Sequence, residues 1–236
     1  QVLAPGFIDT HTHDDRFVLS GPDMAPKVSQ GVTTVVTGNC GVSLAPLRPE
    51  GALPPPLDLL GDETGYCFDS FARYLDAIDA HPAAVNVVAL VGHTTLRIGA
   101  MGALDRPARD SEIEAMRDAI GEALAAGAAG MSTGLFYDPA NAASTDEVIA
   151  LAEVLAPAGA IYATHMRDEA DHIVEALDET LHIGRAAGVR VLVSHHKIQG
   201  ANNFGRTKET LARIDAARAG QDVAVDVYPY AAASTV

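Results

Sequence analysis

The stretch IYATHMRDEADHIVEALDETLHIGRAAGVRVLVSHHK (residues 161–197) contains two apolar runs separated by a helical pattern. IYATH and VRVLVSHH are short and rich in residues that favour strands. Between them, apolar residues recur at helical spacing: Ile173, Val174, Ala176 and Leu177. The pattern predicts a strand, a helix and a second strand, in a repeat of roughly 30 residues that is typical of a βα unit.

The same alternation extends to both sides of this stretch. Five more apolar runs bring the number of candidate strands to seven: PGFIDTH (5–11), VTTVVTGNC (32–40), VNVVALVGH (85–93), GAAGMSTGL (127–135) and VAVDVYPY (223–230). Helical periodicity predicts further helices over 107–127, 145–157 and 207–219. Residues 47–66 are rich in Pro, Gly and Leu and indicate a loop insertion rather than a domain boundary.

Near-continuously apolar strands joined by helices predict a parallel sheet covered by helices. Either a doubly wound sheet or a (β/α)8 barrel lacking its last unit accommodates seven strands. Polar residues follow every candidate strand in chain order: His11 and His13, Cys40, His93, Ser132 and Thr133, His165, His195 and His196, Tyr228 and Tyr230. A doubly wound sheet collects ligands mainly at one switch point, so this ring of polar strand ends favours the barrel.

Acidic residues outnumber Lys and Arg by 31 to 16, which gives a formal charge of -15. This charge repels phosphate and anionic lipid, so we expect no nucleic acid and no membrane partner. No apolar run is long enough to span a bilayer, and the first residues do not resemble a secretory signal. We therefore expect a cytoplasmic protein whose site, if it binds a carboxylate, supplies local positive charge.

His11 and His13 are two residues apart, so on a strand they point to the same face and could chelate one metal ion. The alternative is a pair of surface histidines. His165 and His195 each end a strand, and alone either is an ordinary hydrogen-bonded polar residue. On consecutive βα units of a barrel the four histidines would converge, which predicts a metal site.

Side chains alternate along a strand, so His195 and His196 cannot both point inward. An inward His195 is accompanied by Val191, Val193 and Lys197, and the opposite phase turns Leu192, Ser194 and His196 inward. The alternation of side chains does not by itself decide which of these two sets points inward. Lys197 beside an inward His195 would supply positive charge, and otherwise it is a solvated lysine. Cys40 is either a thiolate zinc ligand or a small buried apolar residue.

GFIDTHTHDD, followed by single histidines at the ends of the fifth and sixth strands, resembles the amidohydrolase superfamily. GVTTVVTGNCGVSLAP, STGLFYDPA, ATHMRDE, VSHHK and DVYPYAAAST resemble its D-aminoacylase family, which includes N-acyl-D-glutamate deacylases. The resemblance covers nearly the whole chain. It implies a (β/α)8 TIM-type barrel of the metal-dependent hydrolase kind, here lacking the eighth βα unit and the small β-domain.

Carried over residue by residue, the resemblance implies one zinc ion bound tightly by Cys40, His165 and His195. It implies a second, weaker metal position at His11 and His13, which are counted with Tyr137 as catalytic residues. Tyr137 matches a position beside the scissile carbonyl, and the positions that hold the substrate carboxylate are matched by Lys197, Tyr228 and Ser234. The resemblance assigns no role to His93.

Two features depart from the wider superfamily. Many members bridge two metals with a carboxylated lysine on the fourth strand, but the lysines here are Lys27, Lys197 and Lys208, none on that strand. We expect Cys40 to take the place of this bridge. The family's general-base Asp on the eighth strand is expected beyond this sequence, so residues 1–236 are interpreted as an incomplete barrel of about seven βα units.

The implied reaction is zinc-dependent hydrolysis of N-acyl-D-amino acids, in which a zinc-activated water attacks the acyl carbonyl and frees a carboxylate and a D-amino acid. The D preference rests wholly on the resemblance. One alternative is a hydrolase of cyclic amides, of the hydantoinase or dihydroorotase type. Another is an inactive barrel fragment that binds metal. The sequence specifies neither the oligomeric state nor the preferred side chain.

Overall fold

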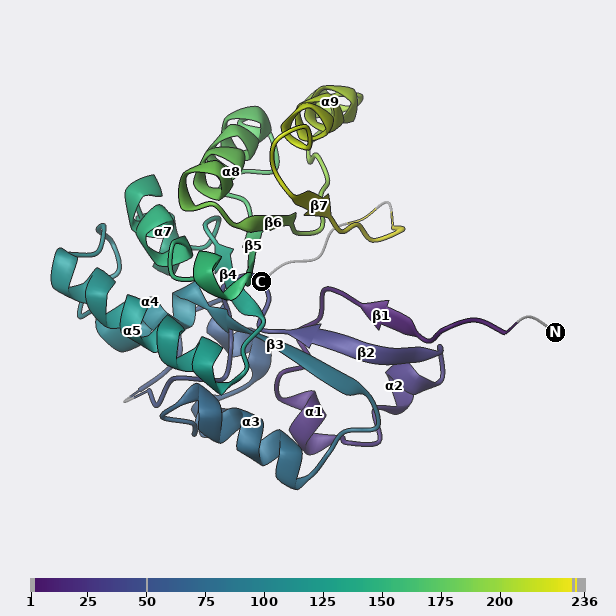
Figure 1. The fold of residues 1–236 in the computed structure, drawn as a ribbon, viewed down its shortest axis with the longest axis vertical. Coiled ribbons are helices and arrows are strands. Elements are labelled where there is room, and N and C mark those ends of the chain that lie inside the picture. Colours follow the sequence, from purple (N-terminus) through teal and green to yellow (C-terminus); the bar gives the residue numbers. More distant parts are fainter. Residues whose placement is uncertain (1–2, 50, 231, 233–236) are drawn as a thin grey trace.

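The computed structural model describes residues 3–49, 51–230 and 232 and contains one curved sheet of seven strands (Figure 1). The strands follow one another in chain order across the sheet: β1 (Phe7–Asp9), β2 (Val32–Thr37), β3 (Asn86–Gly92), β4 (Gly130–Gly134), β5 (Ile161–His165), β6 (Arg190–Val193) and β7 (Val223–Val225). All seven predicted strands are present. The prediction for β5 matches the observed bounds, and the others end within a few residues of theirs.

Every neighbouring pair of strands is parallel, and the strand order never reverses. A doubly wound sheet requires such a reversal, so the structure confirms the alternative with a curled, barrel-like sheet. No pairing joins β1 to β7 within the described residues, and the sheet is a partial barrel. Because all strands run in one direction, their carboxyl ends lie along a single rim.

The helices lie along the outer side of the sheet (Figure 1). They are α1 (Phe17–Ser20), α2 (Ala25–Val28), α3 (Phe71–Ala80), α4 (His93–Ala100), α5 (Asp110–Ala126), α6 (Asp138–Asn141), α7 (Thr145–Ala152), α8 (Ile173–Ala187) and α9 (Thr207–Ala217). The expected helix at 145–157 ends earlier, at Ala152, and a 3-10 turn follows at Ala156–Ala158. None of the helices in the described part of the chain is long and apolar enough to cross a bilayer.

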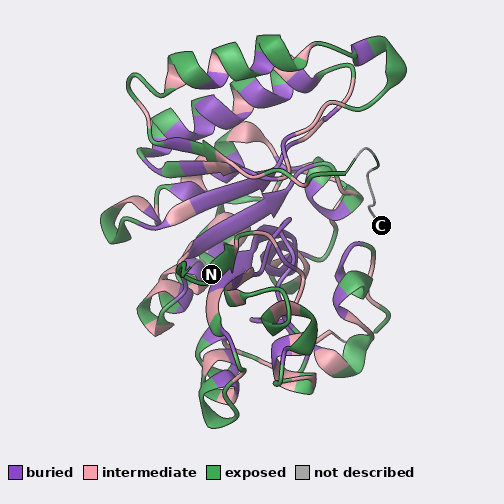
Figure 2. Ribbon diagram, turned by 90° about the vertical axis from the view of Figure 1, so that its right-hand side faces the viewer, coloured by how far each residue is buried: buried purple, intermediate pink, exposed green. Residues whose placement is uncertain are grey.

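The two faces of the sheet carry different side chains. Met131, Tyr162 and Val191 are buried in the apolar core between the strands and the helices. The opposite face carries small residues at neighbouring positions, including Ser132 and Ala163, which pair directly. Figure 2 shows the central strands buried and the outward surfaces of the helices exposed. The small residues leave space at the inner face for side chains from the strand ends.

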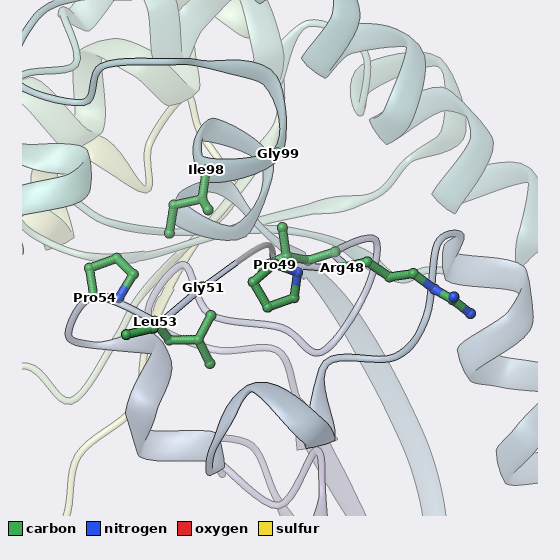
Figure 3. Close-up of a pocket in the computed structure, with 9 residues that line it drawn as sticks. Arg48, Pro49, Gly51, Leu53, Pro54, Ile98 and Gly99 are labelled. Atoms are coloured by element: carbon green, nitrogen blue, oxygen red, sulfur yellow. The ribbon is translucent and has the colours of Figure 1, made fainter.

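Residues 47–66 form an irregular loop with two 3-10 turns, Leu57–Leu60 and Glu63–Gly65. The loop borders a hollow of about 450 Å³ against Ile98 and Gly99 (Figure 3). Apolar side chains face this hollow, whereas the Arg48 side chain points away from it. Among the described residues, neither an acidic residue nor a histidine lines the hollow. The interpretation of 47–66 as an insertion stays a prediction.

A buried ionic cluster joins α4 to α7. Glu147 accepts hydrogen bonds from Arg97, from the Ala108 backbone N–H at 2.9 Å and from His93 at 3.1 Å, and the side chains of Arg97, His93 and Glu147 are fully buried. Burial alone would raise the pKa of Glu147, but the contacts with His93, Ala108 and Arg97 lower it to about 2. His93 directly follows β3, as expected, but it also starts α4 and its side chain points into the helical layer.

Replacing Glu147 with Gln is expected to lower the free energy of unfolding by about 3–5 kcal/mol, because Arg97 then keeps a buried charge without its partner. Urea-induced unfolding followed by circular dichroism measures the change. Glu112→Gln is the control, since Glu112 pairs with the partly exposed Arg106 at 2.7 Å. Equal losses in the two variants would show that burial of the charge is not the cause.

Candidate metal centre

The turn after β2 carries Cys40, and hydrogen bonds to a residue of β4 hold it in place. The Ser132 hydroxyl donates to the Gly38 carbonyl and accepts a hydrogen bond from the Gly41 N–H at 2.9 Å. A Cβ at Gly38 would clash with the Leu90 carbonyl, so the turn needs glycine there. Cys40 itself has a φ of 54°, in the left-handed region. This unusual backbone directs its thiol toward the neighbouring strand ends.

Cys40 lies between two histidines. Its Sγ is 3.2 Å from Nε2 of His11 and 3.5 Å from Nε2 of His195, and the residue is buried. One ligand atom from each of the three residues lies within 4.8 Å of the other two, a spacing that could hold one metal ion. The thiol and the imidazoles come from the ends of β1, β2 and β6.

His195 reaches this group because the strand alternation stops before it. Val191 faces α8, where a Cβ at Gly184 would meet its side chain. Continued alternation would turn His195 toward the helices as well, but its φ of 36° is left-handed and redirects it. His196 instead contacts the Thr210 hydroxyl of α9 at 3.0 Å. The expectation that an inward His195 shares its phase with Val191 and Val193 is therefore wrong.

A second group of possible ligands shares His195 with the first. His165, Glu169 and His195 again have ligand atoms within 4.8 Å of one another. Glu169 lies 2.9 Å from Nδ1 of His195, 3.6 Å from Nε2 of His165 and 2.5 Å from Nζ of Lys197. Burial alone would raise the pKa of Glu169, but these neighbours lower it to about 2. The glutamate is thus a buried anion at neutral pH.

The protonation states suit a cation. Burial, reinforced by His195, lowers the pKa of His165 to about 3, and burial with His11 and His195 lowers that of His13 to about 4, so both imidazoles are neutral and can donate a lone pair. Burial, with the nearby carboxylates Glu169 and Asp226, raises the pKa of the Cys40 thiol. A bound divalent cation would reverse this last effect and favour the thiolate.

The donor atoms fit zinc in particular. Zn²⁺ is borderline soft and binds thiolate, imidazole and carboxylate, which are the groups gathered here. Nδ1 of His13 is buried and makes no hydrogen bond within the described residues. Buried polar atoms without partners are costly, and a cation nearby would offset that cost.

Sequence reasoning missed two carboxylates of the centre, Glu169 and Asp226. Asp226 accepts a hydrogen bond from the His195 N–H at 2.6 Å, and its other oxygen lies 3.4 Å from Nδ1 of His11. It directly follows β7, as the histidines follow their strands, and this position could have identified it. Of the two residues expected at that strand end, Tyr228 and Tyr230, the second is 75% exposed.

Of the predicted substrate-binding residues, those in the described part of the chain lie near the same centre. Nζ of Lys197 is 3.0 Å from Nδ1 of His195 and 5.7 Å from the centre of the Tyr228 ring. Lys197 and Tyr228 border a cavity of about 380 Å³. The Tyr137 hydroxyl is 3.3 Å from Nδ1 of His165. Ser234 lies outside the described residues.

The distances group the possible metal ligands differently from the resemblance. The resemblance placed His165 with Cys40 and His195, whereas the distances group His11 with them and His165 with Glu169. His13 belongs to neither group, although its ring centre lies 5.6 Å from that of His11. The two groups share His195, so the centre is one continuous cluster rather than a separate trio and pair.

The sequence and the fold of the chain are similar to those of known proteins. A sequence profile of the amidohydrolase family matches residues 1–235. A D-aminoacylase from Alcaligenes xylosoxydans xylosoxydans is 59% identical over 235 residues, which cover 100% of this chain and 48% of the relative. The chain thus spans about half the length of the curated relatives it matches.

Two solved structures are also similar. A D-aminoacylase crystal structure superposes with a TM-score of 0.96 at 57% identity, covering 98% of this chain and 48% of that one. An N-acyl-D-glutamate deacylase from Bordetella bronchiseptica, complexed with zinc and a phosphonate mimic of the tetrahedral intermediate, superposes with a TM-score of 0.92 at 47% identity, covering 96% and 48%. With a match over residues 1–235 and this sheet, the chain belongs to the amidohydrolase family.

Proposed function

We propose that the protein containing this chain is a zinc-dependent deacylase that hydrolyses N-acyl-D-amino acids. The observation that carries the proposal is the buried cluster in which His195 lies between Cys40 and Glu169, at the carboxyl rim of a parallel sheet. The similarity to D-aminoacylase and to an N-acyl-D-glutamate deacylase bound to zinc supports the substrate class.

Cys40, His165 and His195 are proposed to hold the zinc ion, with a second and weaker position at His11 and His13. Zinc bound there would act as a Lewis acid and lower the pKa of a coordinated water. Glu169 fixes the orientation of His195 by accepting a hydrogen bond from its Nδ1–H at 2.9 Å, and Lys197 holds Glu169 through an ion pair of 2.5 Å. A ligand ring that donates its other ring N–H to a carboxylate keeps the tautomer whose remaining nitrogen can bind a metal.

The amino-acid part of the substrate is proposed to bind beside β6 and β7. Lys197 supplies the positive charge that a chain with a net charge of -15 otherwise lacks at this site. Tyr228 adjoins it, and the resemblance adds Ser234. Fixing the α-carboxylate aligns the amide bond with the metal centre, which lowers the entropic part of the barrier.

Tyr137 is proposed to act on the scissile carbonyl. Its hydroxyl lies 3.3 Å from Nδ1 of His165, so it reaches the edge of the cluster. A phenol at this position donates a hydrogen bond to the carbonyl oxygen as negative charge develops there. The proton of the attacking water is assigned, by resemblance alone, to the family's general-base Asp on the eighth strand.

The same proposal includes a small-molecule substrate, a cytoplasmic location and neither nucleic acid nor a membrane as partner. The acidic composition supports these points, since the chain would repel phosphate and anionic lipid.

Release of free amine from matched N-acetyl-D- and N-acetyl-L-amino acids tests the activity. The full-length natural protein, purified and supplied with zinc, is expected to release amine from the D series selectively. Hydrolysis of cyclic amides alone would place the protein with hydantoinase-type enzymes. Zinc binding without any turnover would leave a metal-binding barrel.

Cys40→Ala is expected to remove most of the bound zinc, because the thiol is the donor closest to His11 and lies within 3.5 Å of His195. Elemental analysis after gel filtration measures zinc per chain. Cys67→Ala is the matched control, since Cys67 is an exposed free cysteine. Full zinc retention in Cys40→Ala would exclude Cys40 as a ligand.

Lys197→Met should raise KM for N-acyl-D-amino acids about tenfold or more, since a charge-assisted hydrogen bond contributes roughly 1.5–3 kcal/mol. The KM for a substrate whose carboxylate is replaced by a carboxamide should change much less. Lys208→Met, at an exposed position of α9, serves as control. An equal effect on both substrates would show that Lys197 acts through Glu169 rather than on the carboxylate.

A further inference from the structure

The segment that carries Tyr137 is held from two sides by arginine side chains. Tyr137 immediately precedes α6, a helix of a single turn. From α4, Nε of Arg97 donates to the Pro139 carbonyl at 2.7 Å. From the loop after β5, Arg167 donates to the Asn141 carbonyl at 2.6 Å and to the Ala143 carbonyl at 3.1 Å. Carbonyls at a helix end lack partners within the helix, and the two guanidinium groups satisfy them.

Each arginine is in turn held by a glutamate of the next layer of helices. Glu147 of α7 pairs with Arg97, and both side chains are fully buried. Glu179 of α8 pairs with Arg167 through two contacts, at 2.8 and 2.9 Å. Two parallel contacts fix the plane of a guanidinium group. The positions of the donors are therefore set by α7 and α8.

The segment is also tightly packed on the metal side. A Cβ at Gly134 would collide with the Cys40 carbonyl and with the Tyr137 ring, so the tyrosine lies directly over the turn that holds Cys40. Asn141 donates to the Leu135 carbonyl at 3.3 Å, which ties the end of α6 to the segment between β4 and α6. A displacement of α6 would consequently move the Tyr137 ring relative to His165.

We propose that Arg97 and Arg167 clamp α6 and thereby position the Tyr137 hydroxyl over the metal centre. Both are positioning residues, because they contact backbone carbonyls and glutamates; Arg97 also donates to the Leu104 and Arg106 carbonyls at 3.2 and 2.8 Å. The catalytic consequence rests on the proposed function, since it requires Tyr137 to act on the scissile carbonyl. The clamp itself is a property of the fold.

Arg167 is the residue to change, because its side chain is 28% exposed, whereas Arg97 is fully buried and its loss would endanger folding. Arg167→Met is expected to lower kcat by about tenfold to a hundredfold, the scale of a misplacement of about 1 Å, with KM changed much less. Arg167→Lys, which keeps the charge and some donors, should restore part of kcat.

Arg106→Met is the matched control. Arg106 also contacts a glutamate, Glu112, through two contacts of 2.7 Å, and its side chain is 27% exposed. Its side chain donates instead to the Pro107 carbonyl at 2.9 Å. Arg106→Met should leave kcat unchanged. This result would show that the loss of an arginine–glutamate ion pair elsewhere does not by itself lower kcat.

The decisive comparison uses Tyr137→Phe. In that background Arg167→Met should lower kcat no further, because its effect passes through the missing hydroxyl. An unchanged kcat in Arg167→Met, or an undiminished effect in the Tyr137→Phe background, would overturn the assignment.

Hydrogen exchange makes the clamp testable without turnover. Backbone amides of 135–143 should exchange faster in Arg167→Met and not in Arg106→Met. Unchanged exchange in Arg167→Met would overturn the clamp. If wild-type protein releases no amine while this exchange difference appears, the proposed function fails and the clamp stands.

Discussion

The contact between Ser132 and the turn at Gly38 and Gly41 underlies the metal centre. This hydroxyl ties the end of β2 to β4, across the intervening β3, and holds Cys40 in a left-handed conformation that costs roughly 1–3 kcal/mol for a residue with a side chain. Small residues on the inner face make the approach feasible. If the turn relaxed, the thiol would leave the space between His11 and His195.

The electrostatics of the cluster follow from burial. The site contains a thiol, neutral imidazoles and the carboxylates Glu169 and Asp226, with Lys197 as the cation paired to Glu169. A single ammonium group leaves this collection short of positive charge, and a divalent cation would balance it. The acidity of the whole chain does not account for this cluster, because Glu169 is buried while most acidic side chains are on the surface.

Much of the fold was predictable because each strand ends in a recognisable way. IYATH alone identified β5, and Gly127 marked the end of α5, where its φ is 117°. The side chains that converge were less predictable. Glu169 lies beyond the strand, so alternation says nothing about it, and the left-handed backbone at His195 breaks the alternation on which its predicted phase depended. The His93 side chain lies in the helical layer because β3 passes into α4 without a loop, which the strand pattern alone does not indicate.

The distribution of buried charge in the helical layer argues for orientation rather than stability. Burying Arg97 with Glu147 costs desolvation energy that their attraction only partly returns, and apolar side chains of similar volume are often as stable. An apolar layer, however, could not donate hydrogen bonds to the Pro139 carbonyl. Together with Arg167, these charges give a one-turn helix a fixed place, although a helix of four residues has little stability of its own. Placing Tyr137 at the start of such an element makes its position depend on α4, α7 and α8, which are anchored in the main core.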